Sequence, residues 1–124
     1  MEINEYVTKA MRTDSNYKNT EVHLCNKETV RLLHSAMGLC TESAEIQDQL
    51  KKHFFYNKEL DLVNIKEEIS DCLWYIALAC DTLKVDPRDI LDMNIKKLQT
   101  RYPEKFSSDK ALNRDLEAER KILE

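Results

Sequence analysis

Glycine and proline are scarce in this sequence, whose 124 residues include one glycine and two prolines. These two residue types form most tight turns, so their scarcity argues against a turn-rich β architecture. The abundant residues are Leu, Lys, Glu, Asp, Ala and Ile, and this composition favours long helices. We therefore expect an all-α fold, and a chain of this length fits a single domain spanning residues 1–124.

An excess of basic residues is also lacking. The formal net charge is −4 at pH 7, and the pI is about 5.5. Proteins that bind nucleic acid non-specifically need clustered Lys and Arg to neutralise many phosphates, so we expect no nucleic-acid partner. An acidic chain can still bind a small polyphosphate if a metal ion and a few local cations offset the repulsion.

Paired cysteine motifs and long apolar runs are missing as well. The four cysteines show no C-x-x-C spacing, and we interpret them as reduced, structural thiols. The longest apolar stretch, residues 72–80, is far too short to cross a bilayer, and no N-terminal run combines basic residues with an apolar segment. We expect a cytoplasmic protein with no membrane partner.

Hydrophobic periodicity predicts where the helices lie. Asp86 can cap the N-terminus of a helix, and Pro87 suits its first position. Pro103 is expected to end that helix. The expected helices cover residues 2–12, 27–52, 61–83 and 86–102, with a loop at 13–20, a connection at 53–60 and a charged tail at 107–124 that can form a further helix. This pattern predicts a four-helix-bundle-like domain built on a long helical hairpin, followed by a C-terminal helical tail.

Residues 72–80 (CLWYIALAC) are apolar around the whole circumference of their predicted helix. Such a helix must be covered on every side, and four short helices of one chain do not easily enclose it. We therefore expect a homo-oligomer in which this helix meets another subunit.

Carboxylates occur as two spaced pairs on the predicted hairpin. Glu42 and Glu45 are three residues apart on its first helix. Glu68 and Asp71 have the same spacing on the second, so each pair projects from one helical face. Most helical carboxylates are solvated, but these border apolar residues. Oxygen ligands without His or Cys select Mg²⁺ or Mn²⁺ over Zn²⁺, and a di-iron site is a weak alternative because no His follows at the third place.

Three motifs follow one another along the chain. Residues 38–45 (GLCTESAE) carry E-x-x-E, residues 67–75 (EEISDCLWY) carry E-x-x-D, and residues 94–103 (NIKKLQTRYP) carry N-x-x-K-L-x-x-R-Y. A single E-x-x-E is a weak signal, whereas the ordered set is specific. Over residues 30–106 the chain resembles the MazG-like nucleotide pyrophosphohydrolases of the all-α NTP pyrophosphatase superfamily. Thr41 and Ser70 stand where many relatives have Gly, and both are small enough to preserve close helix packing.

The resemblance implies an activity and an assembly. It implies hydrolysis of a nucleoside triphosphate between its α and β phosphates, giving the monophosphate and pyrophosphate. It implies a homodimer or a homotetramer formed from two dimers. It also implies that Mg²⁺ is held by four carboxylates, those of Glu42, Glu45, Glu68 and Asp71. We expect either Glu42 or Glu45 to accept the proton of the attacking water, and the sequence does not choose between them.

Further residues are candidates for substrate binding. Lys97 and Arg101 share a helical face with Asn94. This face is either a solvated basic stripe or, as the resemblance implies, a set of phosphate contacts. Lys52 is a weaker candidate, because a cation also favours a helix C-terminus. Trp74 follows Asp71 by three residues and could stack on a base, although a lone Trp in an apolar helix is more often part of a core.

Two alternative functions remain open at this stage. One is a non-enzymatic helical interaction module, in which the carboxylate face and the apolar helix serve only assembly. The other is the related dUTP or phosphoribosyl-ATP pyrophosphohydrolase chemistry on the same frame. By analogy alone, a deoxynucleotide such as dCTP or dUTP is the preferred substrate.

Overall fold

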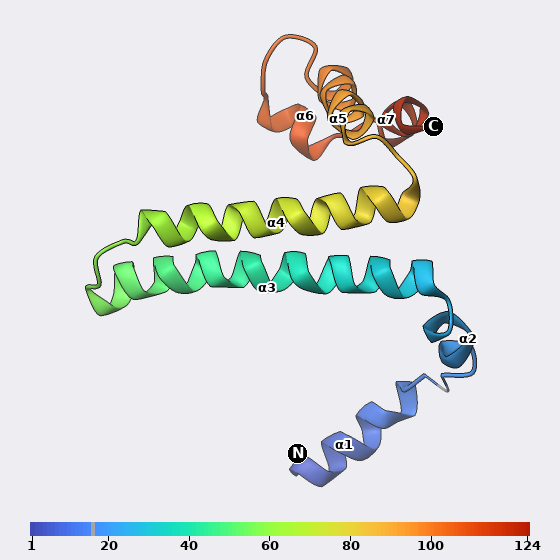
Figure 1. Ribbon diagram of the computed structural model, residues 1–124. Helices are drawn as coiled ribbons and strands as arrows, with labels where there is room; N and C mark the ends of the chain where they lie inside the picture. Colours follow the sequence, from blue (N-terminus) through green and yellow to red (C-terminus); the bar gives the residue numbers. More distant parts are fainter. Residues whose placement is uncertain (16) are drawn as a thin grey trace.

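The computed structural model describes residues 1–15 and 17–124, and over these residues the chain forms α-helices, one short 3-10 helix and no strand (Figure 1). The expected all-α fold is confirmed. The expected loop at 13–20 includes Asn16, which lies outside the described residues. The elements are α1 (Ile3–Ala10), η1 (Met11–Thr13), α2 (Thr20–Leu24), α3 (Lys27–Tyr56), α4 (Leu62–Leu83), α5 (Pro87–Arg101), α6 (Ser108–Leu112) and α7 (Leu116–Leu123).

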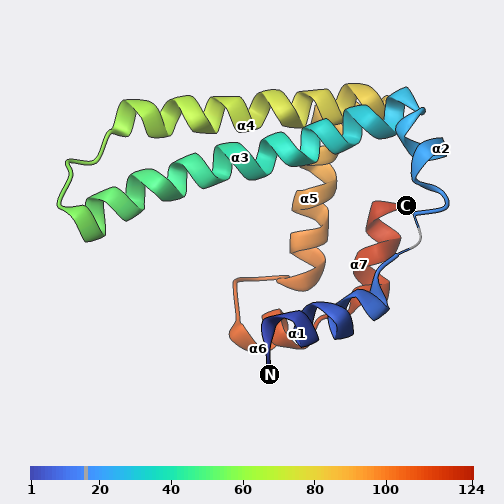
Figure 2. The ribbon, with the colours of Figure 1, turned by 90° about the horizontal axis from the view of Figure 1, so that it is seen from below.

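The two longest helices, α3 and α4, lie side by side as an antiparallel hairpin, which confirms the predicted centre of the fold (Figures 1 and 2). Side-chain caps fix where each helix begins. Asn26 accepts a hydrogen bond from the backbone N–H of Thr29 at 3.0 Å, and Asp61 accepts two at the start of α4. α3 ends at Tyr56 and is capped by Asn57, whose φ of 53° is left-handed. The helix therefore continues four residues beyond the predicted Lys52, through the aromatic residues 54–56.

The hairpin helices approach closely near their middle. The hydroxyl of the buried Ser35 donates a hydrogen bond of 2.5 Å to the backbone carbonyl of Tyr75 on α4. Gly38, one turn further along α3, is buried against the Tyr75 ring, and a β-carbon at Gly38 would overlap the ring atoms Cδ1, Cε1 and Cζ. These contacts set the spacing and the register of the two helices at this level.

Of the three C-terminal helices, α5 and α7 pack against each other. α5 begins at Pro87 with Asp86 as its cap, as predicted, and then packs against α7. Glu119 of α7 is only 3% exposed and accepts hydrogen bonds from two guanidinium groups, those of Arg101 and Arg114. The predicted helical tail thus forms as α6 and α7, and a buried ion pair attaches α7 to α5.

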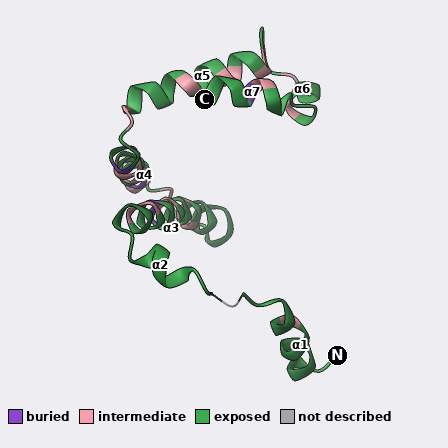
Figure 3. Ribbon diagram, turned by 90° about the vertical axis from the view of Figure 1, so that its right-hand side faces the viewer, coloured by how far each residue is buried: buried purple, intermediate pink, exposed green. Residues whose placement is uncertain are grey.

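Apolar burial is sparse in the isolated chain (Figure 3). Cys80 is the one hydrophobic residue that is buried in the described part of the chain. Many large apolar side chains on α3 and α4 are exposed instead. Among the described residues, no helix is long and apolar enough to span a membrane.

Candidate metal site

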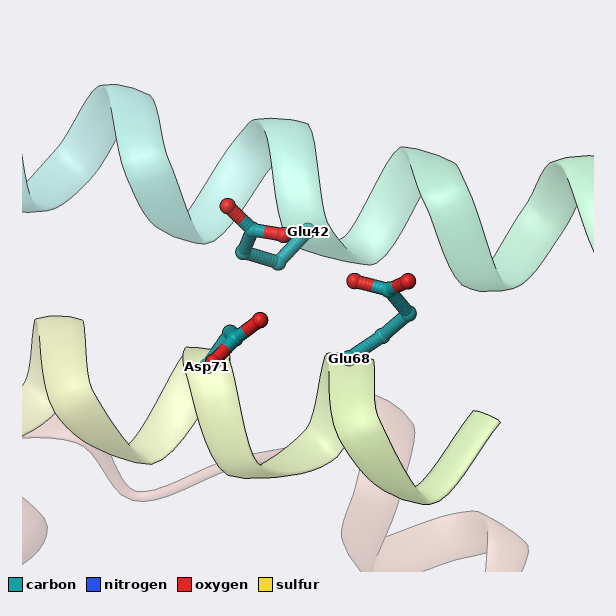
Figure 4. A group of neighbouring side chains, drawn as sticks. All are labelled: Glu42, Glu68 and Asp71. Atoms are coloured by element: carbon teal, nitrogen blue, oxygen red, sulfur yellow. The ribbon is translucent and has the colours of Figure 1, made fainter. Parts of the chain in front are cut away.

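Three carboxylates face one another across the hairpin. Glu42 projects from α3, and Glu68 and Asp71 project from α4 into the space between the helices (Figure 4). One carboxylate oxygen from each residue lies within 4.8 Å of the other two. The three-residue spacing places Glu68 and Asp71 on one face of α4, and the antiparallel register puts Glu42 opposite that face. The structure therefore brings together residues from both predicted carboxylate pairs.

The composition and spacing of this group fit a hard cation. Its donors are all carboxylate oxygens, which suit Mg²⁺ and Mn²⁺. Two oxygens that bind one Mg²⁺ at about 2.0–2.1 Å lie at most about 4.2 Å apart. Small side-chain rotations would bring oxygens that now lie within 4.8 Å into this range.

The electrostatics of the cluster also favour a cation. The pKa of Glu42 is raised, first because burial desolvates the carboxylate and then through hydrogen bonding with Glu68 and repulsion from its acidic neighbours. The pKa of Glu45 is raised too, and the largest cause is repulsion from Glu68. Ionised carboxylates this close together repel one another, and a positive charge between them removes that penalty.

Glu45, the fourth predicted ligand, lies beside the group of three carboxylates. Its oxygen is not among those within 4.8 Å of one another. Glu45 nevertheless interacts with the group, because repulsion from Glu68 is the largest cause of its raised pKa. Glu45 is exposed to solvent, whereas Glu68 is 4% exposed. Three of the four predicted ligands thus converge, and Glu45, outside that group, has greater access to water than Glu68.

An open hollow of about 370 Å³ adjoins the carboxylates and is lined by Glu42, Asp71, Trp74 and Tyr75. Trp74 is 57% exposed, so it is not a core residue of the isolated chain. Its ring stands edge-on to Tyr75, with centroids 5.0 Å apart, and His34 contacts both rings in a similar manner. The structure therefore brings a flat aromatic surface next to the predicted metal ligands.

Two of the predicted phosphate-binding cations have carboxylate partners. Lys52 lies 2.5 Å from Asp48, one turn earlier on α3. Arg101 makes a two-pronged contact of 2.7 and 2.8 Å with Glu119, which raises the pKa of Arg101. Asn94 is exposed and Lys97 is half-buried on α5, and no α5 residue lines the hollow among the residues described. Within one chain, the structure does not bring the α5 candidates to the carboxylates.

Two amide side chains that the sequence did not single out lie next to the cluster. Asn64 of α4 donates a hydrogen bond of 2.7 Å to Glu68, and Gln49 of α3 donates one of 2.6 Å to Asn64. The signal available in the sequence was spacing alone, since Asn64 precedes Glu68 by four residues and Gln49 follows Glu45 by four. That spacing becomes meaningful once the register of the hairpin is known.

The family to which this chain is related follows from comparison with known proteins. The profile of the MazG nucleotide pyrophosphohydrolase domain matches residues 32–106, which include all four carboxylates and α5. Searches of curated proteins and of solved structures gave no significant match. The family match covers more than half of the chain, and the facing carboxylates agree with it. The chain belongs to the family of MazG nucleotide pyrophosphohydrolases.

Proposed function

We propose that this protein is a Mg²⁺-dependent nucleoside triphosphate pyrophosphohydrolase that cleaves between the α and β phosphates. The observation that carries the proposal is the convergence of Glu42, Glu68 and Asp71 from two helices, with oxygens within 4.8 Å of one another. The family match supports the reaction class. A scaffold that served only assembly would gain nothing from placing carboxylates so close together, since their repulsion is unfavourable. A cytoplasmic location stays a prediction from the sequence.

Each residue of the site has a distinct role in this proposal. Glu42, Glu68 and Asp71 hold the metal ion, with Glu45 as the fourth ligand or as the base. When bound, Mg²⁺ neutralises phosphate charge and lowers the pKa of a coordinated water. We favour Glu45 over Glu42 as the group that accepts the water proton, because Glu45 lies beside the three clustered carboxylates and is open to solvent. Its carboxylate oxygen would hold that proton during attack on the α phosphorus.

The substrate would lie in the hollow beside the carboxylates. Trp74 offers an exposed ring on which a base can stack, and base–aromatic stacking contributes roughly 1–3 kcal/mol. Stacking tolerates every base, so Trp74 alone does not select one. By analogy a deoxynucleotide such as dCTP or dUTP remains the preferred substrate. We propose that phosphate is contacted by Lys52, Lys97, Arg101 and Asn94. The guanidinium of Arg101 now binds Glu119, so it must leave Glu119 or bind both partners at once.

The product of the reaction tests the proposal directly. With Mg²⁺ and a panel of nucleoside triphosphates, phosphorus NMR should show pyrophosphate and the nucleoside monophosphate appearing together in equal amounts. Attack at the α phosphorus leaves the pyrophosphate unit intact, whereas a phosphatase releases orthophosphate first. Addition of a chelator should stop the reaction. Early orthophosphate with a nucleoside diphosphate would contradict the proposed reaction, and absence of turnover for the whole panel would favour the non-enzymatic alternative.

We also propose that the functional unit is a homo-oligomer, a dimer or a dimer of dimers. The outer face of α4 carries exposed apolar side chains at helical spacing, which we call the outer stripe: Leu62, Ile69, Leu73, Ile76 and Leu83. Their exposed fractions lie between 41% and 60%, and the stripe is about 30 Å long at 1.5 Å per residue. It lies opposite the face that carries Glu68 and Asp71. A second copy presenting the same stripe would bury both.

Leu73→Glu should weaken self-association at least about tenfold, because a buried unpaired charge costs several kcal/mol at an interface. Leu73 is 59% exposed, so the charged variant has room to fold as a single chain. Sedimentation over a concentration series measures the effect, and Leu73→Met is the matched control because it preserves volume and polarity. A wild type that is active and monomeric at micromolar concentration would refute the oligomer.

A further inference from the structure

Gln49 and Asn64 extend the carboxylate face of the hairpin by one helical turn. Asn64 precedes Glu68 by four residues on α4, and Gln49 follows Glu45 by four on α3. Both amide side chains are half-buried. Because the helices are antiparallel, the turn beyond the carboxylates on α3 faces the turn before them on α4. The two amides therefore meet across the hairpin at the end nearest the connecting loop.

The hydrogen bonds of these two amides run in one direction. Gln49 Nε2 donates to Asn64 Oδ1 at 2.6 Å, and Asn64 Nδ2 donates to Glu68 Oε1 at 2.7 Å. An ionised carboxylate only accepts, so it must face the NH₂ group of Asn64. The carbonyl of Asn64 then faces Gln49, which must in turn present its own NH₂ group. The same NH₂ group of Asn64 also makes a longer hydrogen bond of 3.4 Å to Glu67 Oε2. The carboxylate of Glu68, with the weaker help of Glu67, thus fixes the orientation of both amides, and the shorter hydrogen bond holds Glu68 in turn.

The backbone around Asn64 is held as well. Asp61 Oδ1 accepts hydrogen bonds of 3.0 Å from the N–H groups of Val63 and Asn64, which caps the first turn of α4. First turns fray unless their N–H groups find acceptors. With this cap, Asn64 is anchored through both its backbone and its side chain. Glu68 is only 4% exposed, so water has little access to replace the Asn64 amide.

We propose that Asn64, oriented by Gln49, is a positioning residue for metal binding that holds the Glu68 carboxylate toward Glu42 and Asp71. This inference rests on the proposed function, because it requires a cation among these carboxylates. Asn64 acts through Glu68 and does not touch the reacting atoms. Removing a side chain that orients a metal ligand typically costs about 10–100-fold in metal affinity or activity.

The proposal predicts a defect that added metal repairs. In Asn64→Leu the volume is similar but the donor to Glu68 is lost, and in Asn64→Asp the donor becomes a second acceptor. Both variants should bind Mn²⁺ at least about tenfold more weakly, and their turnover should recover as the metal concentration rises. A merely structural role for Asn64 would lower turnover at every metal concentration. Asp is favourable in the first turn of a helix, so Asn64→Asp should fold even if the leucine variant does not.

The experiment titrates metal-free protein with Mn²⁺ and follows the free ion by electron paramagnetic resonance. Gln47→Leu is the matched control, because it removes an exposed amide from α3 outside this chain of hydrogen bonds. Wild type and Gln47→Leu should bind alike. Wild-type affinity in the Asn64→Asp variant would overturn the positioning role while leaving the metal site intact. A wild type that binds no Mn²⁺, or whose binding survives Asp71→Asn, would instead overturn the metal site and the positioning role together.

Discussion

Asp71→Asn should lower turnover by at least about a hundredfold while leaving helical content unchanged. The substitution keeps the volume of the side chain but removes one of three negative charges whose oxygens lie within 4.8 Å of one another. Loss of a residue that merely orients a ligand costs about 10–100-fold, so loss of a ligand charge should cost more. Glu45→Gln should have a comparable effect, because it removes the proposed proton acceptor.

A pyrophosphate-release assay together with circular dichroism measures both consequences. Asp81→Asn is the matched control: it makes the same change on the same helix, at an exposed residue that pairs with Arg31 at 2.6 Å. A surface pair of this kind contributes about 0–1 kcal/mol to stability, so activity should stay near that of the wild type. Near-wild-type turnover in both Asp71→Asn and Glu45→Gln would rule out the site.

Gly38→Ala should destabilise the protein, by up to about 2 kcal/mol. In most helices this substitution stabilises by about 1 kcal/mol, because alanine has the higher helix propensity. Here the new β-carbon would overlap the ring of Tyr75, and overpacking costs about 1–3 kcal/mol. The ring cannot move freely, since His34 and Trp74 contact it edge-on. The steric term should therefore exceed the propensity term.

Urea denaturation of Gly38→Ala, Tyr75→Ala and the double variant tests this expectation. In the double variant the ring is gone, so the added methyl group should no longer be unfavourable, and the two substitutions should be clearly non-additive. Gly38→Ala should also lower activity, since separating the helices at this level moves Glu42 away from Asp71. A Gly38→Ala variant more stable than the wild type would show that the helices are not in close contact at this level.

The hairpin could be predicted from the sequence because its signals are local. Periodicity marked both long helices, whose predicted starts at residues 27 and 61 lie within one residue of the observed ones. The Asp86-Pro87 pair gave the start of α5 in the same way. The end of α3 was predicted too early, because residues 53–56 break the apolar period yet remain helical until Asn57 adopts its left-handed conformation. The five-residue α2 was not predicted, since so short a segment shows no period.

The partners of charged side chains could not be predicted. Arg101 and Glu119 are 18 residues apart on different helices, and nothing in the sequence separates an Arg that binds phosphate from one that pairs with a buried Glu. Two of the carboxylate ligands share a face by spacing alone, but their meeting with Glu42 depends on how α3 and α4 are aligned. The same alignment determines the contact between Gln49 and Asn64, which sequence spacing suggests only after the fact.

The short connection between α3 and α4 has a consequence for the order of folding. Every carboxylate of the site lies on this one hairpin, whose helices are joined by residues 57–61. Closing so short a loop costs little chain entropy, and helical structures with contacts close in sequence fold within microseconds to milliseconds. The carboxylates can therefore meet as soon as the hairpin closes, before α5, α6 and α7 have packed. Repulsion among them then arises at the first step of folding, so a divalent cation that is present early should speed the formation of the hairpin.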